Sequence, residues 1–208
     1  MRINQPRIPP LDDDAFSAED RARLNGIFKE APVYNVFRTL ARSPNAFKRF
    51  MGWGGYILSS DNDLNARDRE LVILRTGYNW RSGYEWAQHE RIGRDSGLTA
   101  EEISAIKRGP GDPLWNKTDR ALLTATDELT GDGFITDETW RALDHLSDKQ
   151  RMDLVMTVGQ YTQVAMMLNT FGVQLDPGFE LDPDLTVDPA RAYRTALQAR
   201  SLRSRSGH

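Results

Sequence analysis

The spacing of apolar and polar residues along this chain predicts helices over most of its length. The segment 65–78 opens with Asn65 as a capping residue, and its apolar run 71–74 covers every side of the expected helix, as in a helix buried at the centre of a protein. Thr99 and Glu102 have the spacing of a capping box at the start of another helix. No stretch shows the strict alternation of a half-buried strand. Further helices are expected at 17–29, 43–58, 82–97, 118–129, 136–143 and 148–171. The predicted fold class is all-α.

Two of the expected helices, 65–78 and 82–96, are joined by a very short connection and should pack as an antiparallel hairpin at the centre of the fold. On the second helix Ser82, Glu85 and His89 are spaced so that they share one face. On the first, Glu70 lies on an apolar stripe, where a carboxylate is costly unless it is paired, hydrogen-bonded or protonated. If the hairpin brings Glu70 to His89, the pair could transfer protons.

Two structural readings of these residues stay open beside the catalytic one. Glu85 and His89 could form a solvated pair on an ordinary polar helix face. Glu70 could be hydrogen-bonded to a backbone group or to Arg75. Spacing does not decide between these readings.

Composition narrows the possible chemistry. The chain has 208 residues and no cysteine, which excludes disulfides, thiolate nucleophiles and iron–sulfur clusters. A net charge of -3 gives no general attraction to nucleic acid or to anionic membranes. The N-terminus lacks the apolar core of a signal peptide, and no apolar run approaches membrane-spanning length. We expect a cytoplasmic protein whose partner is a small-molecule substrate, with no nucleic-acid or membrane partner.

The two ends differ from the rest of the chain. Residues 1–16 are proline-rich, and 176–208 contain repeated Asp-Pro pairs before a basic tail. We predict an N-terminal arm over 1–16, a helical domain over 17–175 and a C-terminal arm or tail over 176–208. These ends could be disordered or could cross onto a neighbouring subunit. A short match of 151–159 to 69–77 also suggests a degenerate internal repeat.

The run RDRELVILRTGYNWRSGYEWAQHERIGRDSGLTAEEI resembles the carboxymuconolactone decarboxylase family, whose other branch is the AhpD-like alkylhydroperoxidases. In the peroxidase branch a glutamate in an R-E-L helix precedes the pattern C-x-x-C-x-x-x-H. Here Glu70 stands at the glutamate, His89 at the histidine, and Ser82 and Glu85 at the two cysteines. The resemblance is strong over 67–106 and extends less specifically over 37–173. It implies an AhpD-like helical bundle.

The missing cysteines exclude the thiol peroxidase activity of that second branch. The resemblance then implies the decarboxylase branch, which removes carbon dioxide from an unsaturated lactone acid and shifts a double bond without a cofactor. We assign His89 as the proton-transfer residue, Glu70 as the group that orients it and Glu85 as a second carboxylate in the pocket. The resemblance also implies a homo-oligomer, a trimer or a hexamer.

Several other residues are candidates for substrate binding. Arg75 and Arg81 could hold substrate carboxylates, and Ser82 shares the motif face. Further candidates are Trp86, Tyr161 and Trp53, the last inside a GWGG run that we interpret as close helix packing. Gln160 and Asn169 could line the same pocket or form core hydrogen bonds. No standard metal-ligand spacing is present, and we predict neither metal nor cofactor.

Two function classes follow. The first is a cofactor-independent lyase that acts by acid–base chemistry on a small carboxylated, lactone-like compound. The second is a non-catalytic binding or assembly protein that kept the fold without its redox cysteines. A Glu70–His89 pair that converges in a closed pocket favours the enzyme, and exposure of the pair favours the binding protein.

Overall fold

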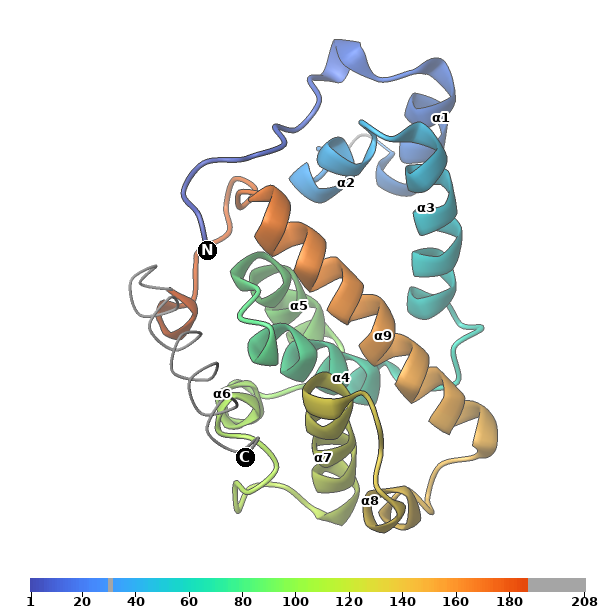
Figure 1. Ribbon diagram of the computed structural model, residues 1–208, viewed down its shortest axis with the longest axis vertical. Coiled ribbons are helices and arrows are strands. Elements are labelled where there is room, and N and C mark those ends of the chain that lie inside the picture. The colour runs from blue at the N-terminus through green and yellow to red at the C-terminus, as the bar shows by residue number, and fades with distance from the viewer. Residues whose placement is uncertain (30–31, 187–208) are drawn as a thin grey trace, which may run out of the picture.

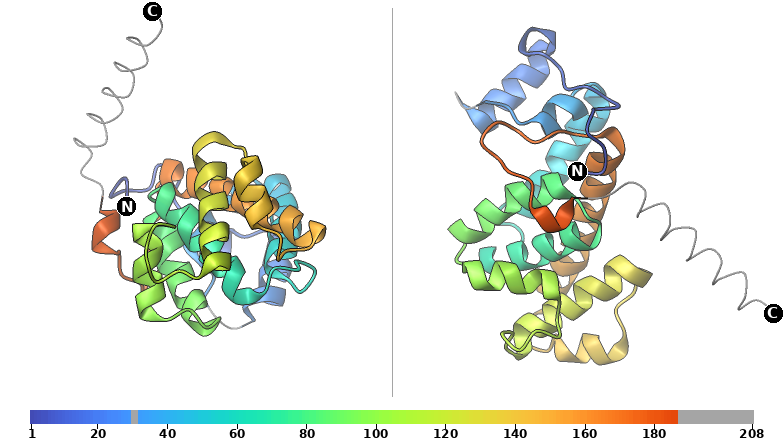
Figure 2. Two further views of the ribbon diagram at one scale, coloured as in Figure 1. Left: turned by 90° about the horizontal axis from the view of Figure 1, so that it is seen from below. Right: turned by 90° about the vertical axis from the view of Figure 1, so that its left-hand side faces the viewer.

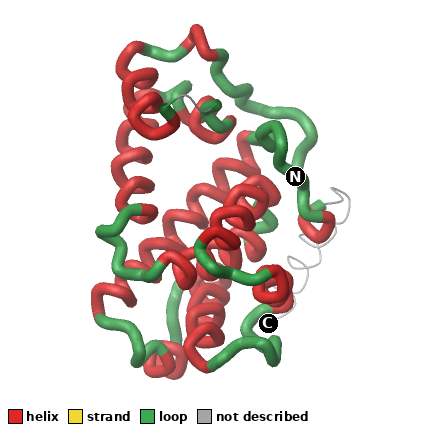
Figure 3. Tube along the Cα trace, turned by 180° about the vertical axis from the view of Figure 1, so that it is seen from behind, coloured by secondary structure: helices red, strands yellow, loops and turns green. Residues whose placement is uncertain are grey.

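The computed structural model describes residues 1–29 and 32–186, and all regular structure in these ranges is helical (Figure 3). The all-α prediction is confirmed. Side-chain caps set many of the helix starts: Asn65, for example, accepts a hydrogen bond from the backbone N–H of Asp68, and the capping box of Thr99 and Glu102 is present. The helices in chain order are α1 Ala18–Phe28, α2 Asn35–Leu40, α3 Pro44–Leu58, α4 Ala66–Asn79, α5 Gly83–Asp95, α6 Ala100–Arg108, α7 Lys117–Asp132, α8 Asp137–Ala142 and α9 Asp148–Phe171, with 3-10 helices η1 Asp13–Ala15 and η2 Pro183–Leu185.

The predicted hairpin is formed by α4 and α5. Glu70 near the start of α4 contacts His89 late in α5, and Gly77 near the end of α4 faces Glu85 early in α5, so the two helices run antiparallel. The apolar run 71–74 on α4 is fully buried, as its pattern predicts. Burial of each such side chain contributes about 1.5–3 kcal/mol. The hairpin is therefore the rigid centre of the fold.

Helix α9 runs across the length of the molecule, with α4 and α5 on one side and α3 on the other (Figures 1 and 2). A large apolar cluster joins α4, α5, α6 and α7 to the first half of α9. A second cluster joins α3, α4 and α5 to the last half of α9, and a third holds α1, α2 and α3 together. None of the helices in the described ranges combines the length and the apolar character that a bilayer crossing requires.

The N-terminal segment 1–16 lies along its own chain. The backbone N–H groups of Arg7 and Ile8 donate to the carbonyl of Phe171 at the end of α9. Gly172 ends α9 with a φ of 71°, and a side chain there would clash with Ile3. Phe16 is buried in the third cluster, so the apolar interior already begins within the predicted arm.

The first residues of the predicted C-terminal arm also pack on the domain. Asp176 and Leu185 are buried, and Lys107 of α6 forms ion pairs with Asp182 and Asp184. The basic tail lies outside the described residues. The internal repeat is not confirmed, because 69–77 belongs to a helix that ends in a turn whereas 151–159 lies inside the continuous helix α9.

Candidate active site

Glu70 and His89 form a buried hydrogen bond across the α4–α5 hairpin. Oε2 of Glu70 lies 2.7 Å from Nδ1 of His89, and Glu70 is only 1% exposed. An ionised carboxylate can only accept, so in that state Nδ1 donates and Nε2 is left free to exchange a proton. The hairpin thus brings together the two residues that the sequence pattern paired.

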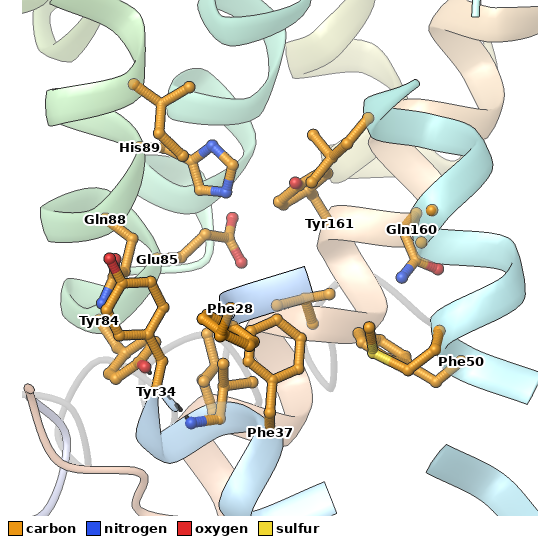
Figure 4. Close-up of a pocket in the computed structure, with 18 residues that line it drawn as sticks. Phe28, Tyr34, Phe37, Phe50, Tyr84, Glu85, Gln88, His89, Gln160 and Tyr161 are labelled. Atoms are coloured by element: carbon orange, nitrogen blue, oxygen red, sulfur yellow. Dashed lines mark hydrogen bonds between the residues drawn. The ribbon is translucent and has the colours of Figure 1, made fainter. Parts of the chain in front are cut away.

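A cavity of about 570 Å³ lies beside this pair, between α5, α9, α3 and the α1–α2 end of the molecule (Figure 4). His89, Glu85 and Tyr161 face it, whereas Glu70 lies behind His89. Its volume is within the range typical of small-molecule sites. Most of its walls are apolar or aromatic, formed by Phe28, Tyr34, Val36, Phe37, Phe50, Met51, Leu58, Tyr84, Ile92, Val164 and Leu168.

Glu85 is a buried carboxyl group without a hydrogen-bond partner among the described residues. Burial raises the pKa of this carboxyl group well above its usual range, which favours the neutral acid. Gly77 makes room for it: a Cβ at Gly77 would lie 2.8 Å from Oε1 of Glu85. A neutral carboxylic acid at a cavity can donate a hydrogen bond to a bound oxygen atom.

Tyr161 completes the polar side of the cavity. Its ring packs edge-on against the His89 ring, with centroids 4.8 Å apart. Burial, and then the charge of Glu70, raise the pKa of its hydroxyl group well above the usual range. Figure 4 shows the Glu85 carboxyl group and the Tyr161 ring on the same side of the cavity as the His89 ring. The site therefore combines one imidazole with two neutral hydroxyl-type donors.

A second group of polar residues fixes α2 beside the cavity. Asp176 accepts hydrogen bonds from the backbone N–H of Asn35, the side-chain amide of Gln88 and the hydroxyl of Tyr84. Burial and the Asp176 charge raise the pKa of the Tyr84 hydroxyl, so Tyr84 acts as a donor. These contacts tie the start of α2 to α5 and to the C-terminal segment.

The two predicted arginine ligands are placed outside the cavity. Nε and Nη2 of Arg75 form a bidentate ion pair with Asp127 of α7, at 2.6 and 2.8 Å, and Nη1 donates to the carbonyl of Ile106. Arg81 lies exposed in the α4–α5 turn with a φ of 52°. Neither Arg75 nor Arg81 is positioned to hold a substrate carboxylate beside His89.

Three further candidates for substrate binding also lie outside the cavity wall. Ser82 and Trp86 are fully buried, Ser82 at the start of α5 and Trp86 in the large cluster, where it packs edge-on against Tyr78. Trp53 is 43% exposed and stacks on Tyr56. The helix faces on which they lie direct these side chains away from the cavity. Of the predicted site residues, Glu85, His89 and Tyr161 line the cavity.

Two glycines of the GWGG run lie at the cavity. Gly54 and Gly55 line the cavity, and a Cβ at Gly55 would have no described atom within 4 Å. Gly55 therefore leaves space at the cavity, whereas Gly54 lies close to Gln160 of α9, as the predicted close packing requires. The exposed side chains of Leu58 and Ile92 also line the cavity, which places its mouth between α3 and α5.

Sequence reasoning missed the aromatic wall from the α1–α2 region. Tyr34 and Phe37 each pack edge to face on Phe28 at the cavity. They lie outside the strong part of the family resemblance, and only their clustering over ten residues could have signalled them. Within the described ranges, no group of three or more His, Cys, Asp or Glu side chains is placed to hold a metal ion.

The α4–α5 hairpin lies in a part of the chain whose sequence is similar to a known family. Residues 44–128 match the sequence model of the carboxymuconolactone decarboxylase family. This stretch, called the family segment below, is similar to that family and covers less than half of the chain. The segment spans α3 to most of α7 and includes Glu70, Glu85 and His89. No curated protein gave a sequence match to this chain.

Solved structures extend the comparison from the family segment to most of the chain. An alkylhydroperoxidase AhpD core protein from Ralstonia eutropha JMP134, described as peroxidase-related, is 21% identical with a TM-score of 0.74, over 83% of this chain and 93% of that chain. A protein of unknown function from Agrobacterium tumefaciens is 23% identical with a TM-score of 0.60, over 65% and 93%. The debrominase Bmp8, in complex with 2,3,4-tribromopyrrole, is 11% identical with a TM-score of 0.68, over 84% and 94%. The fold is AhpD-like, as the sequence pattern predicts.

Proposed function

We propose that this protein is a cofactor-independent enzyme that moves protons on a small, mostly apolar carbonyl compound of the unsaturated lactone type. The observation that carries the proposal is the buried Glu70–His89 hydrogen bond at the wall of the cavity. A buried pair of this kind favours an enzyme over a binding protein that merely kept the fold. The family segment supports an acid–base lyase or isomerase of the decarboxylase type.

His89 would take the proton from one carbon of the substrate and return it to another. Glu70 holds Nδ1, so the lone pair or proton on Nε2 is directed at the ligand. General acid–base groups of this kind contribute about 100- to 10,000-fold in rate. In a decarboxylation, the same nitrogen would supply the proton that replaces the lost carbon dioxide.

Glu85 and Tyr161 would stabilise the negative charge that develops on the carbonyl oxygen. The raised pKa values of both groups favour their neutral forms, which donate hydrogen bonds. A carboxylic acid kept neutral by an apolar site can serve as an oxyanion donor. Donors held at the position of developing charge lower the barrier without reorganisation during the reaction.

The cavity walls favour an apolar substrate. None of the described residues that line the cavity is a lysine or an arginine, so a substrate carboxylate could be neutralised only by a protonated His89. Bmp8, which shares the fold, binds a small halogenated ring. A neutral lactone is therefore the first candidate, and a carboxylated lactone is the second, supported by the family segment.

The test is proton exchange in deuterated water, followed by proton NMR. The neutral unsaturated lactone α-angelica lactone and the lactone acid muconolactone are each incubated with the purified protein. We expect a double-bond shift with deuterium incorporation, reduced about 100- to 10,000-fold in His89→Gln. Full activity in that variant would contradict the mechanism. Tight binding of these compounds without any exchange would favour the alternative, a non-catalytic binding protein.

A further inference from the structure

Gln160 presents a buried amide to the cavity without a partner for its carbonyl oxygen. The residue is 4% exposed, lines the cavity from α9, and Oε1 has no hydrogen-bond partner among the described residues. Buried polar groups are almost always paired, so an unpaired one beside a cavity marks the position of a missing partner. The two ends of an amide can exchange places, so a bound hydroxyl or carbonyl group could satisfy it.

The space in front of this amide is kept open by α3. A Cβ at Gly54 would make an ordinary contact of 3.6 Å with Nε2 of Gln160, and Gly55 faces space that no described atom fills within 4 Å. In Figure 4 the amide lies on one side of Tyr161, and the groups of Glu85 and His89 lie on the other. A ligand that fills the cavity can therefore be held at two separate polar points.

The remaining walls indicate the body of the ligand. Aromatic rings reach the cavity from three sides, and they favour a flat ring system over a flexible chain. An anion would find no lysine or arginine among the described lining residues. Burial disfavours the charged form of Glu85 as well, which is consistent with a neutral ligand.

We infer that Gln160 is a specificity-determining residue that binds the hydroxyl or carbonyl group of an uncharged ring compound. This inference rests on the proposed function for the location of the site and defines the substrate class of that site. It concerns binding, which can be measured without turnover.

The experiment compares the affinities of three probes that share the naphthalene ring at pH 7: 2-naphthol, naphthalene and 2-naphthoate. For the intact protein we expect 2-naphthol to bind at least about 10-fold more tightly than 2-naphthoate, because the anion lacks a counter-charge. Gln160→Leu should weaken 2-naphthol binding about 2- to 10-fold, the value of one lost hydrogen bond, and leave naphthalene binding unchanged or tighter.

Gln163→Leu is the matched control, since Gln163 lies on the exposed side of the same helix. It should alter none of the three affinities. Circular dichroism establishes that each variant folds, and Gln160→Met replaces Gln160→Leu if the latter does not. Equal affinities for 2-naphthol and 2-naphthoate, or the same loss for naphthalene as for 2-naphthol in Gln160→Leu, would overturn the inference. If these affinities behave as expected while no lactone is turned over, the proposed function fails and the binding inference stands.

Discussion

Glu70 acts on the cavity only through His89, and this separates its role from that of the residues in the wall. It lies behind the imidazole, with one oxygen on Nδ1 and the other without a partner among the described residues. Ser82 occupies the same hairpin but is fully buried away from the cavity. Substitution at these two positions can therefore distinguish positioning of the base from the shape of the site.

Glu70→Gln is expected to lower kcat by about 100-fold or more and to leave KM nearly unchanged, because a neutral amide no longer stabilises the imidazolium in the transition state. Steady-state kinetics on the lactone identified by the exchange assay measures both constants. Ser82→Ala should retain nearly normal kinetics. If Glu70→Gln raises KM and leaves kcat unchanged, Glu70 shapes the pocket and does not position the base.

Glu85 makes the stability of the protein depend on pH. Its pKa is raised in the folded state by burial, so the folded protein keeps a proton that the unfolded chain releases near the usual glutamate pKa. The free energy of unfolding is therefore highest below about pH 4.5 as far as this group is concerned, and it falls as the pH rises toward the raised pKa. Burial of the Glu85 carboxyl group therefore lowers the free energy of unfolding near neutral pH.

Glu85→Gln should remove this dependence, since an amide has no proton to lose. Between pH 5 and pH 8 we expect the free energy of unfolding of the intact protein to fall by about 1–3 kcal/mol more than that of the variant. One proton retained by the folded state changes this free energy by about 1.4 kcal/mol per pH unit. Urea unfolding at each pH gives the values. Glu101→Gln on the exposed side of α6 is the control and should follow the intact protein. Parallel curves for Glu85→Gln and the intact protein would mean that Glu85 is ionised in the fold.

At the scale of helices, the hairpin could be predicted from the sequence because its signals are local. Asn65 caps α4, the apolar run 71–74 requires burial, and the short turn leaves antiparallel packing as the simple solution. Once the two helices pack, the spacing of Glu70 and His89 brings them into contact. The central site residues were therefore accessible to sequence reasoning.

The errors concern side chains whose partners lie far away in the chain. Arg75 pairs with Asp127, which is 52 positions later on α7, and no local sequence pattern predicts that ion pair. Trp53 and the glycines share one helix, and only the packing of α3 decides that Gly54 and Gly55 face the cavity. The aromatic wall depends on how α1 and α2 fold back, which rests on contacts between distant segments.

The tie between α2 and α5 can be tested through Asp176. Asp176→Ala removes the acceptor of three hydrogen bonds, and we expect a loss of about 2–4 kcal/mol in unfolding free energy, since hydrogen bonds to charged groups are the stronger ones. Hydrogen exchange followed by mass spectrometry should show that the substitution accelerates exchange in α2 more than in α4, relative to the intact protein.

Asp182→Ala provides the control for this experiment. Asp182 lies in the same C-terminal segment but pairs with Lys107 of α6, so its loss should leave exchange in α2 unchanged. Unchanged exchange in α2 of Asp176→Ala would show that the aromatic packing alone holds α2 in place.

At the scale of the whole molecule, one face of α9 exposes several large apolar side chains. Met152, Val155 and Met166 follow one another along the helix with exposures of 56%, 39% and 50%. Gly159 and the polar residue Gln163 lie between Val155 and Met166 on the same exposed stripe. Large exposed apolar stripes on a helix favour contact with another protein surface.

We predict a homo-oligomer, a trimer or a hexamer, that uses this stripe of α9. Light scattering at micromolar concentration should give the mass, and the double variant Val155→Lys/Met166→Lys should reduce it by placing charges in the interface. The exposed substitution Thr118→Lys on α7 is the control. A monomer in the intact protein at that concentration would contradict the prediction.

The open position at Gly55 makes the molecule suited to single-site labelling. The chain has no cysteine, so Gly55→Cys would introduce the sole thiol in the sequence. A Cβ there would have no described atom within 4 Å, and Gly55 stands at the cavity wall, so a thiol-reactive fluorophore could be attached without competing reactions. Its emission would then report the arrival and departure of ligands in real time, even for compounds that the protein binds but does not convert.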